Sequence, residues 1–333
     1  MRVPRGTQYL CAHMQVIEII KDALTAGKTR FTFELLPPLK GDGVAGVFEA
    51  IDPLMEFGPA YINVTYHRED VKYVERPGGL LEKRVVRRRP GTVGISAAIM
   101  KRYGVEVVPH LICGGLSRYD IEDALIDMDF LGISNVLALR GDNRRGERTF
   151  TPQPDGHTYA EELVRQIVDM NNGVFVDGEV EECHHSQFCI GVAGYPEKHA
   201  ESPNPDADIR ALKAKVDAGA SYISTQMSFD NRRIFDFIDR CRAAGIDVPI
   251  IPGIKPFSTK SQLSLLPQTF HVDLPQDLVA EVEKCRDNRA VRQVGVEWAI
   301  QQARELRAAG VPVIHFYTMG KTDNVYNIAK EIF

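Results

Sequence analysis

The stretch IRALKAKVDAGASYIST, residues 209–225, contains the unit that decides the fold. Ile209, Leu212 and Val216 recur at helical spacing, Gly219 can take the left-handed conformation that ends a helix, and residues 222–225 are typical of a short buried strand. The same pattern of helix, glycine and strand recurs along the chain. The glycines that mark it are Gly27, Gly58, Gly104, Gly132, Gly173, Gly219, Gly245 and Gly310.

Strands that alternate with helices are joined by crossover connections, which places them in a parallel sheet covered by helices. An open doubly wound sheet is one alternative, but eight helix-to-strand steps fit a closed barrel more economically. We therefore predict an α/β fold, a (β/α)8 TIM barrel that forms a single domain over residues 1–333, with residues 1–28 as an N-terminal helical extension. The longer intervals between units predict inserted loops, at residues 75–90, 143–157, 177–187 and 267–287.

Composition excludes several classes of protein. The chain has 333 residues, of which 44% are hydrophobic and 26% charged, as in ordinary globular proteins. Its net charge of −5 has the wrong sign for binding duplex DNA, so we expect no nucleic-acid partner. No apolar run approaches the roughly 20 residues that span a bilayer, and no secretory signal is evident, so we expect no membrane partner and a cytoplasmic location. The six cysteines are too sparse for a disulfide framework and predict free thiols.

Three motifs favour structural explanations over functional ones. The segment 41–46 matches G-x-G-x-x-G, but residues 37–40 separate it from the preceding strand, whereas a dinucleotide-binding turn passes directly from strand to helix. Cys183-His184-His185 favours a solvated loop over a zinc site, because no second cluster completes a tetrahedron, and we expect no metal. The basic run 83–89 favours a solvated face; a phosphate or polyglutamate ligand is the alternative.

The carboxyl ends of the predicted strands carry polar side chains in nearly every unit. Active-site groups of a parallel barrel lie at these ends. Glu34, between a Phe-rich strand and a Pro-Pro turn, is a candidate acid with a raised pKa. The other explanation, that Glu34 pairs with a base such as His110 or Lys255, stays equally open. The strand-end residues are Glu34, Thr65, Tyr66, His110, Arg140, Asp142, Tyr195, Gln226 and Lys255.

Nine segments, distributed from the first predicted strand to the last, occur in the order and spacing of one enzyme family. They are FTFELLPP (31–38), NVTY (63–66), PHL (109–111), LALRGD (137–142), AGYPE (193–197), KVDAG (215–219), TQ (225–226), IIPGI (250–254) and HFYT (315–318). Together they resemble methylenetetrahydrofolate reductase. The resemblance implies a flavoenzyme of one-carbon metabolism and methionine synthesis. In that family NADH or NADPH reduces FAD, which then reduces 5,10-methylenetetrahydrofolate to 5-methyltetrahydrofolate by a ping-pong relay.

The resemblance also implies residue roles. Glu34 corresponds to the general acid that protonates N10 of the folate and opens its ring to a 5-iminium cation. Asp142 corresponds to the aspartate near the flavin that stabilises this cation. Gln226 corresponds to the residue that binds the pterin, Gln262 to a second polar group of the folate site, and Lys321 to a position near the substrate tail where relatives often have arginine. The implied FAD contacts are Thr65, Tyr66, His110, Arg140, Gly141, Asp142, Tyr159, Ala160, Tyr195, His199, Asp208 and Lys215.

The chain departs from the family pattern at several places. Residues 67–70 replace small residues beside the second strand, where they bear on the flavin surroundings and on nicotinamide access. Ala211 and Ala214 replace polar residues that reach FAD in some relatives, and the segment 177–187 is longer than the usual connection. The sequence does not decide between NADH and NADPH.

Two other functions are alternatives. One is a related flavin barrel such as a proline-dehydrogenase-like oxidase, which Glu34 and Gln226 argue against. The other is a non-catalytic flavin- or folate-binding subunit, which Glu34 and Asp142 argue against. A homo-oligomer is common in the resembled family and is expected here. The chain resembles the catalytic half of longer two-domain relatives, and no room for their regulatory domain is expected after the last helix.

Overall fold

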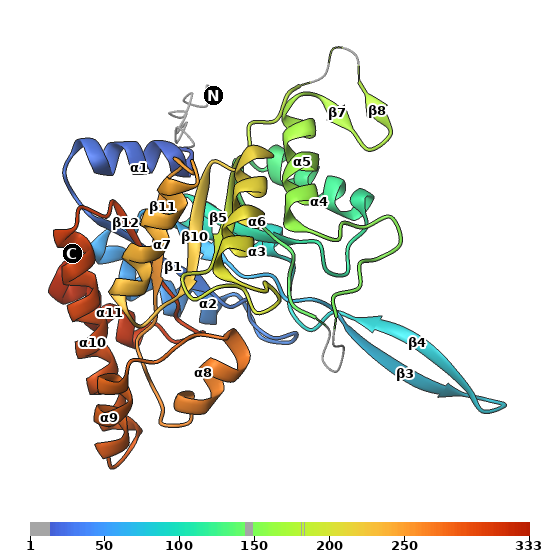
Figure 1. Cartoon of the computed structure of the whole chain (residues 1–333). Helices are drawn as coiled ribbons and strands as arrows, with labels where there is room; N and C mark the ends of the chain where they lie inside the picture. Colours follow the sequence, from blue (N-terminus) through green and yellow to red (C-terminus); the bar gives the residue numbers. More distant parts are fainter. Residues whose placement is uncertain (1–13, 144–148, 181, 183) are drawn as a thin grey trace, which may run out of the picture.

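Eight parallel strands close into a barrel in a computed structural model that describes residues 14–143, 149–180, 182 and 184–333 (Figure 1). Their spatial order is β1-β12-β11-β10-β9-β6-β5-β2, so every neighbouring pair is joined by a crossover except where β12 meets β1. The predicted (β/α)8 barrel is confirmed. The barrel strands are β1 (Arg30–Leu35), β2 (Ile62–Val64), β5 (Val107–Ile112), β6 (Asn135–Leu139), β9 (Cys189–Gly194), β10 (Tyr222–Met227), β11 (Ile250–Ile254) and β12 (Val313–Phe316).

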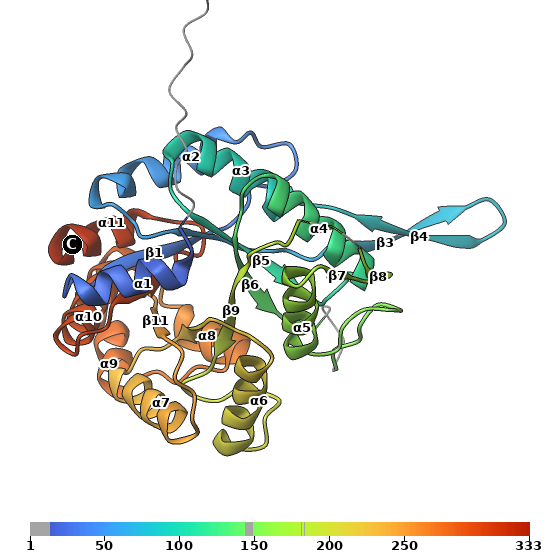
Figure 2. The ribbon, with the colours of Figure 1, turned by 90° about the horizontal axis from the view of Figure 1, so that it is seen from above.

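Helices surround the barrel, as the view from above shows (Figure 2). Outward-facing strand residues such as Phe33, Val136 and Ile190 are buried against the apolar faces of these helices in one large core. The helices of the described chain after residue 40 are α2 (Ala45–Ile51), the 3-10 helix η1 (Asp52–Phe57), α3 (Thr92–Tyr103), α4 (Arg118–Phe130), α5 (Ala160–Asn171), α6 (Pro205–Asp217), α7 (Asn231–Ala243), α8 (Gln262–Phe270), α9 (Gln276–Lys284), α10 (Asn288–Ala308) and α11 (Asp323–Ile332). None of the helices in the described ranges is long and apolar enough to cross a membrane.

The glycines that marked the repeating unit all have positive φ, from +59° at Gly58 to +120° at Gly219. Each therefore adopts the backbone conformation that other residues rarely take, as the pattern predicted. Seven of them lead directly into a barrel strand. Gly173 instead leads into a small hairpin, β7 (Val174–Phe175) and β8 (Gly178–Glu179), before β9 begins.

Three of the four segments expected to be loops contain regular structure, so that expectation was wrong in detail. The first is a hairpin of β3 (Asp70–Arg76) and β4 (Leu80–Val86), which projects away from the barrel (Figures 1 and 2). Its turn uses Gly78 and Gly79, both at positive φ, which is a hairpin signal that the sequence carried. The segment 177–187 contains β8, and 267–287 contains α9. Residues 144–148 of the remaining segment lie outside the described residues.

The helix α1 (Val16–Thr25) covers the amino-terminal ends of the strands. Val16, Ile19 and Ile20 are buried against interior residues of the barrel, including Tyr61 and Tyr222. In the described part of the expected N-terminal extension, residues 16–25 are helical. In Figure 1, α1 lies at the upper end of the barrel, and α8 and the β3–β4 hairpin lie at the lower end.

The described cysteines are free thiols, as predicted. Cys113, Cys189 and Cys241 are buried, and Cys285 is half-buried. Cys11 and Cys183 lie outside the described residues. The exposed His184, in the described part of the Cys-His-His run, lies 3.6 Å from Asp129.

Candidate active site

The polar strand-end residues gather at the carboxyl-terminal end of the barrel, opposite α1. Phe33 of β1 pairs in register with Phe316 of β12, and Phe316 pairs with Ile254 of β11. The next residues on the three strands, Glu34, Tyr317 and Lys255, therefore stand at one level. Because side chains alternate along a strand, these three face the barrel interior, whereas Phe33, Phe316 and Ile254 belong to the outer core.

Glu34 is a buried acid with 8% of its surface exposed. Burial raises its pKa from an ordinary carboxyl value to about 7, and the positive charge of Lys255 opposes that rise. Within the described part of the chain, neither His110 nor Lys255 forms a hydrogen bond or ion pair with this carboxyl group. The two explanations left open for Glu34 thus combine: it is an acid with a raised pKa, and Lys255 is its charged neighbour.

Two buried histidines lie inside the barrel. His110 of β5 has no hydrogen-bond partner for its Nε2 among the described residues. His315 of β12 lies 3.4 Å from the Asn63 amide through its Nδ1. Burial lowers the pKa of each to about 3, and the nearby His67 and His110 respectively lower it further. Both imidazoles are therefore neutral at pH 7, and the buried Nε2 of His110 is without a hydrogen-bond partner in the described part of the chain.

Arg140, at the end of β6, binds Glu201 through two hydrogen bonds of 2.6 and 2.9 Å. Its guanidinium also lies 5.0 Å from the centre of the Phe150 ring. Such a bidentate pair fixes the plane of the arginine. The hydrogen bonds from Arg140 lower the pKa of Glu201.

A second cluster joins β9 to α6. The Lys215 ammonium donates to the Ala193 carbonyl at 2.6 Å and lies 6.0 Å from the centre of the Tyr195 ring. The Tyr195 ring meets His199 edge to face at 4.8 Å. Asp208 accepts a hydrogen bond from the Ser202 hydroxyl at 2.7 Å. Burial lowers the pKa of Lys215 to about 8, while Asp208 opposes that change.

Other residues of the site are placed around these clusters. Asp142 is exposed, and its charge acts on both Tyr195 and His67. His67, from the segment that departs from the family pattern, bonds to the Thr65 hydroxyl at 3.2 Å. Burial and Arg89 lower the pKa of His67, and Asp142 opposes the change. Tyr66 is half-buried beside them.

The predicted folate-binding residues differ in their hydrogen bonds and in their exposure. The Gln226 side-chain oxygen accepts from the Met227 amide at 3.0 Å. The Gln262 oxygen accepts from the amides of Ser258 and Thr259 at 2.7 and 3.3 Å, so it holds the loop after β11. Lys321 is exposed on the loop before α11.

Two side chains of this region were not singled out by sequence reasoning. Glu197 is half-buried and accepts a hydrogen bond from the Ser228 hydroxyl at 2.7 Å. Burial raises its pKa to about 7. The Tyr317 hydroxyl donates to the Thr225 carbonyl at 2.7 Å. Both lie in segments that carry the family resemblance, which was the available signal.

The arrangement fits a bound FAD. His110 offers a buried polar atom that has no partner among the described residues, and Arg140 and Lys215 offer positive charge. Gly141 has φ +84°, a backbone conformation that favours glycine. A Cβ at this position would also lie 3.1 Å from the side chain of Ile112, so a larger residue would crowd it. Ala160 begins α5 and Tyr159 is its N-cap, so the first turn of this helix and the positive end of its dipole lie at these two residues.

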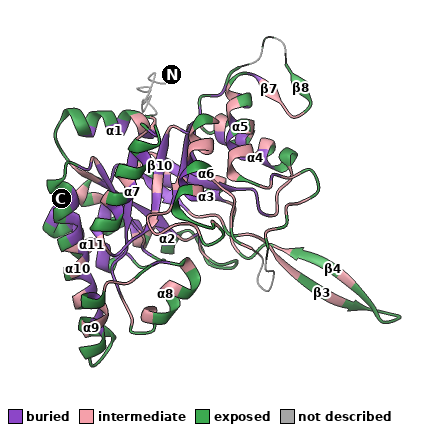
Figure 3. Cartoon of the chain, in the orientation of Figure 1, coloured by how far each residue is buried: buried purple, intermediate pink, exposed green. Residues whose placement is uncertain are grey.

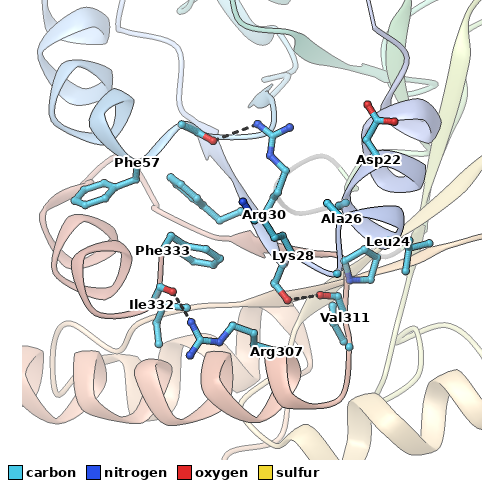
Figure 4. Close-up of a pocket in the computed structure, with 17 residues that line it drawn as sticks. Asp22, Leu24, Ala26, Lys28, Arg30, Phe57, Arg307, Val311, Ile332 and Phe333 are labelled. Atoms are coloured by element: carbon cyan, nitrogen blue, oxygen red, sulfur yellow. Dashed lines mark hydrogen bonds between the residues drawn. The ribbon is translucent and has the colours of Figure 1, made fainter.

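A cavity of about 770 Å³ lies at the opposite end of the barrel (Figure 4). Its lining includes Lys28, Arg30, Arg307 and Phe333. The Arg30 guanidinium donates to the Gly58 carbonyl at 3.3 Å, and Arg307 donates to the Ile332 carbonyl at 2.6 Å. The first bond joins the start of β1 to the end of η1, and the second joins α10 to α11. In parallel barrels this end serves stability, and the chemistry belongs to the other.

Residues 19–332 match the family model of methylenetetrahydrofolate reductase. The chain belongs to this family. The family expected from the nine segments is thereby confirmed.

Individual relatives agree with this assignment. The chain is 32% identical over 329 residues to methylenetetrahydrofolate reductase (NADH) 1 of Arabidopsis thaliana, covering 96% of this chain and 51% of the relative. It is 31% identical over 309 residues to 5,10-methylenetetrahydrofolate reductase of Pectobacterium carotovorum subsp. carotovorum, covering 92% and 91% respectively. It thus spans about half the length of the plant relative and most of the bacterial one.

The fold is also found among solved structures. One of them is an uncharacterized protein from Clostridium thermocellum that binds two copies of 5-methyl-5,6,7,8-tetrahydrofolic acid. The two align with a TM-score of 0.53 at 13% identity, over 94% of this chain and 98% of the other. At this identity the likeness concerns the fold alone.

Proposed function

We propose that this protein reduces 5,10-methylenetetrahydrofolate to 5-methyltetrahydrofolate, with NADH or NADPH as the hydride donor and FAD as the carrier. The observation that carries the proposal is Glu34, a buried acid with a pKa of about 7 at the carboxyl end of the first barrel strand of a family member. A carboxylic acid that stays protonated near neutral pH can give its proton to a weakly basic amine.

In this proposal Glu34 acts first on the substrate. Its proton passes to N10 of the folate as the bond between N10 and the bridging methylene breaks, and the electron pair of that bond stays on N10. The substrate then carries a 5-iminium cation, and Glu34 is left as a carboxylate. Asp142 supplies negative charge near this cation, and Gln226 orients the pterin through its amide group.

His110, Arg140, Lys215 and the backbone at residues 141 and 159–160 would hold FAD. The further contacts proposed for it are Thr65, Tyr66, Tyr195, His199 and Asp208. When bound, FAD supplies the hydride transfer between the nicotinamide and the folate. Gln262 and Lys321 would bind the remainder of the folate; a lysine at 321 offers charge but no bidentate geometry to a carboxylate.

The organisation of the chain completes the proposal. Residues 1–333 would form one FAD-binding barrel domain of a cytoplasmic homo-oligomer that works in one-carbon metabolism and methionine synthesis. We favour this function over a proline-dehydrogenase-like oxidase or a non-catalytic binding subunit, because the chain belongs to the reductase family and combines Glu34 with Gln226 and Asp142.

The test is a pair of half-reactions. The purified protein is reconstituted with FAD, its visible spectrum is recorded, and flavin reduction by NADH or NADPH is followed under anaerobic conditions. The reduced protein is then mixed with methylenetetrahydrofolate. Flavin reoxidation with formation of methyltetrahydrofolate is the expected result. A protein that binds no flavin after reconstitution, or one whose reduced flavin is not reoxidised by the folate, would refute the proposal.

A further inference from the structure

Lys255 occupies an unusual position for a charged residue. It follows the last residue of β11 and has only 2% of its surface exposed. Its ammonium donates to the Pro256 carbonyl at 3.2 Å, and no ion pair to it exists among the described residues. Buried charges are ordinarily paired, because removing them from water is costly. The barrel interior therefore contains a lysine whose one hydrogen-bond acceptor among the described residues is a neutral carbonyl group.

The strand register places Glu34 opposite this lysine. The order β1-β12-β11 separates the two residues by one strand, and both stand one step beyond the aligned set Phe33, Phe316 and Ile254. They face the barrel interior at the same level. Their charges act on one another in both directions: Lys255 stabilises the Glu34 carboxylate, and Glu34 stabilises the Lys255 ammonium.

We propose that Lys255 is a positioning residue for the acid Glu34, and that its ammonium stabilises the carboxylate that remains when Glu34 has given its proton to the folate. This inference rests on the proposed function. The proton leaves the Glu34 carboxyl for N10 of the folate, no proton leaves Lys255, and the product of the step is a buried carboxylate beside a buried ammonium. The favourable charge pair therefore exists after proton transfer and not before it.

Few other groups act on Glu34. In the described part of the chain, Tyr317, from the strand between, is a further titratable group on which Glu34 acts, and burial raises the pKa of this phenol so that it stays neutral. His110 and His315, also inside the barrel, are neutral because burial lowers the pKa of each to about 3. Asn63, the register partner of Glu34 on β2, carries no charge. The burial of Lys255 itself lowers its pKa to about 8, which leaves it largely protonated at neutral pH. A substitution that removes the Lys255 ammonium therefore tests the effect of that one charge on the pKa of Glu34.

The first experiment titrates Glu34 without any folate. Protein labelled with ¹³C at the glutamate carboxyl groups is followed by NMR over pH, and the Glu34 signal is assigned by its absence in Glu34→Gln. Lys255→Met is expected to raise the pKa of Glu34 by roughly 1 to 3 units, because an opposite charge at close range has been removed. Lys255→Arg keeps the charge and should hold the pKa near its wild-type value.

Lys260→Met is the matched control. Lys260 lies on the same loop, but it is exposed and donates to the Glu283 carbonyl at 2.7 Å. Lys260→Met removes the same charge from a residue that does not face Glu34, so the pKa of Glu34 should not change. If Lys255→Met fails to fold, Lys255→Gln replaces it. The reciprocal measurement needs no change at Lys255. Glu34→Gln should lower the pKa of Lys255, which is measured by NMR on protein with labelled lysine side chains.

The second experiment connects the titration to the reaction. In Lys255→Met the folate half-reaction should slow by about three- to tenfold at pH 6, and its high-pH limb should move upward with the pKa of Glu34. Flavin reduction by the nicotinamide should stay within about twofold of wild type. Failure of the wild-type folate half-reaction would count against the proposed function alone, because the NMR titration does not use it.

The inference is overturned by either of two results. One is a Glu34 titration that is the same in wild type, Lys255→Met and Lys260→Met. The other is a Lys255→Arg protein that behaves like Lys255→Met, because then the loss would follow from packing rather than from charge.

Discussion

Glu34 can act as an acid near neutral pH because two opposing effects set its pKa. Burial disfavours the carboxylate, and Lys255 favours it. Neither effect alone would suit proton donation, since a fully exposed carboxyl would be ionised at pH 7 and a fully isolated one would hold its proton too tightly. The value of about 7 lies between these limits.

Replacing this carboxyl should separate the two half-reactions. Glu34→Gln keeps the shape of the side chain but has no acidic proton, so the folate half-reaction should fall by at least about a hundredfold. Flavin reduction by the nicotinamide should continue. Stopped-flow absorbance of the flavin measures both. Glu75→Gln, on the exposed hairpin, is the control; a Glu34→Gln protein that is reoxidised at the rate of this control would show that Glu34 is not the acid.

His315 predicts a dependence of stability on pH. Its folded-state pKa is about 3, whereas an unfolded histidine titrates near 6.5. Between these values the unfolded chain binds a proton that the folded chain does not, so the stability that neutral His315 contributes is present above pH 6.5 and is lost as the pH falls toward 3. The slope is at most about 1.4 kcal/mol per pH unit for one group.

His315→Gln should therefore show a weaker loss of stability between pH 6.5 and pH 4 than the wild type. Urea denaturation at several pH values measures the free energy of unfolding. The exposed His185→Gln is a suitable control. Parallel curves for wild type and His315→Gln across this range would contradict the assignment of a neutral, buried imidazole.

At the scale of elements, strands were easier to foresee than insertions. The strand ends at Glu34, His110 and Gln226 follow from local patterns, because a helix, a glycine and an apolar run are all read within about 20 residues. The β3–β4 hairpin was missed because the boundary expected at residue 75 cut through its first strand. Tyr73 is 65% exposed and Leu81 63%, so the hairpin lacks the half-buried alternation by which strands are recognised (Figure 3).

The sequence raised the proximity of Glu34 and Lys255 as one possibility, beside His110, but could not establish it. It depends on the closure of the barrel, which brings β12 against β1 and places β11 next in order. The two residues are far apart in the chain, and no local spacing relates them. The sequence could name both as strand-end residues, but only the register shows that they stand at one level.

Helix packing predicts the effect of a glycine substitution. Gly295 lies within α10, and a Cβ there would overlap the backbone of Phe257 in the loop after β11. Backbone cannot move aside as a flexible side chain does, so Gly295→Ala should destabilise the protein by about 3 kcal/mol or more. Gly94→Ala is the control, because Gly94 lies in α3 with nothing near its Cβ position. It should be neutral or stabilise by about 0.5 kcal/mol.

Thermal and urea unfolding measure both variants. The prediction concerns the difference between two glycines in helices, so it does not depend on helix propensity alone, which favours alanine at either site. Equal stabilisation by the two substitutions would mean that α10 does not approach the loop as closely as the structure has it.

The whole molecule divides stability and chemistry between the two ends of one barrel. The candidate site lies at the carboxyl ends of the strands, and α1 covers the amino ends, where Val16, Ile19 and Ile20 fill the barrel interior. This is the division expected of parallel barrels. A defect at α1 should therefore lower the free energy of unfolding without lowering the activity of the folded protein.

Ile20→Ala tests this division. Ile20 is fully buried against the barrel, so its truncation should lower the free energy of unfolding by about 2 to 5 kcal/mol, through lost apolar contact and the cavity that remains. Leu24 belongs to the same helix but is 55% exposed, and Leu24→Ala should cost less than about 1 kcal/mol. At a temperature well below both unfolding transitions, the two half-reactions of both variants should match the wild type, because the strand ends that carry Glu34 and His110 are held by the outer core and not by α1. A loss of folate reduction in folded Ile20→Ala would show that packing at the covered end is transmitted through the barrel to the site.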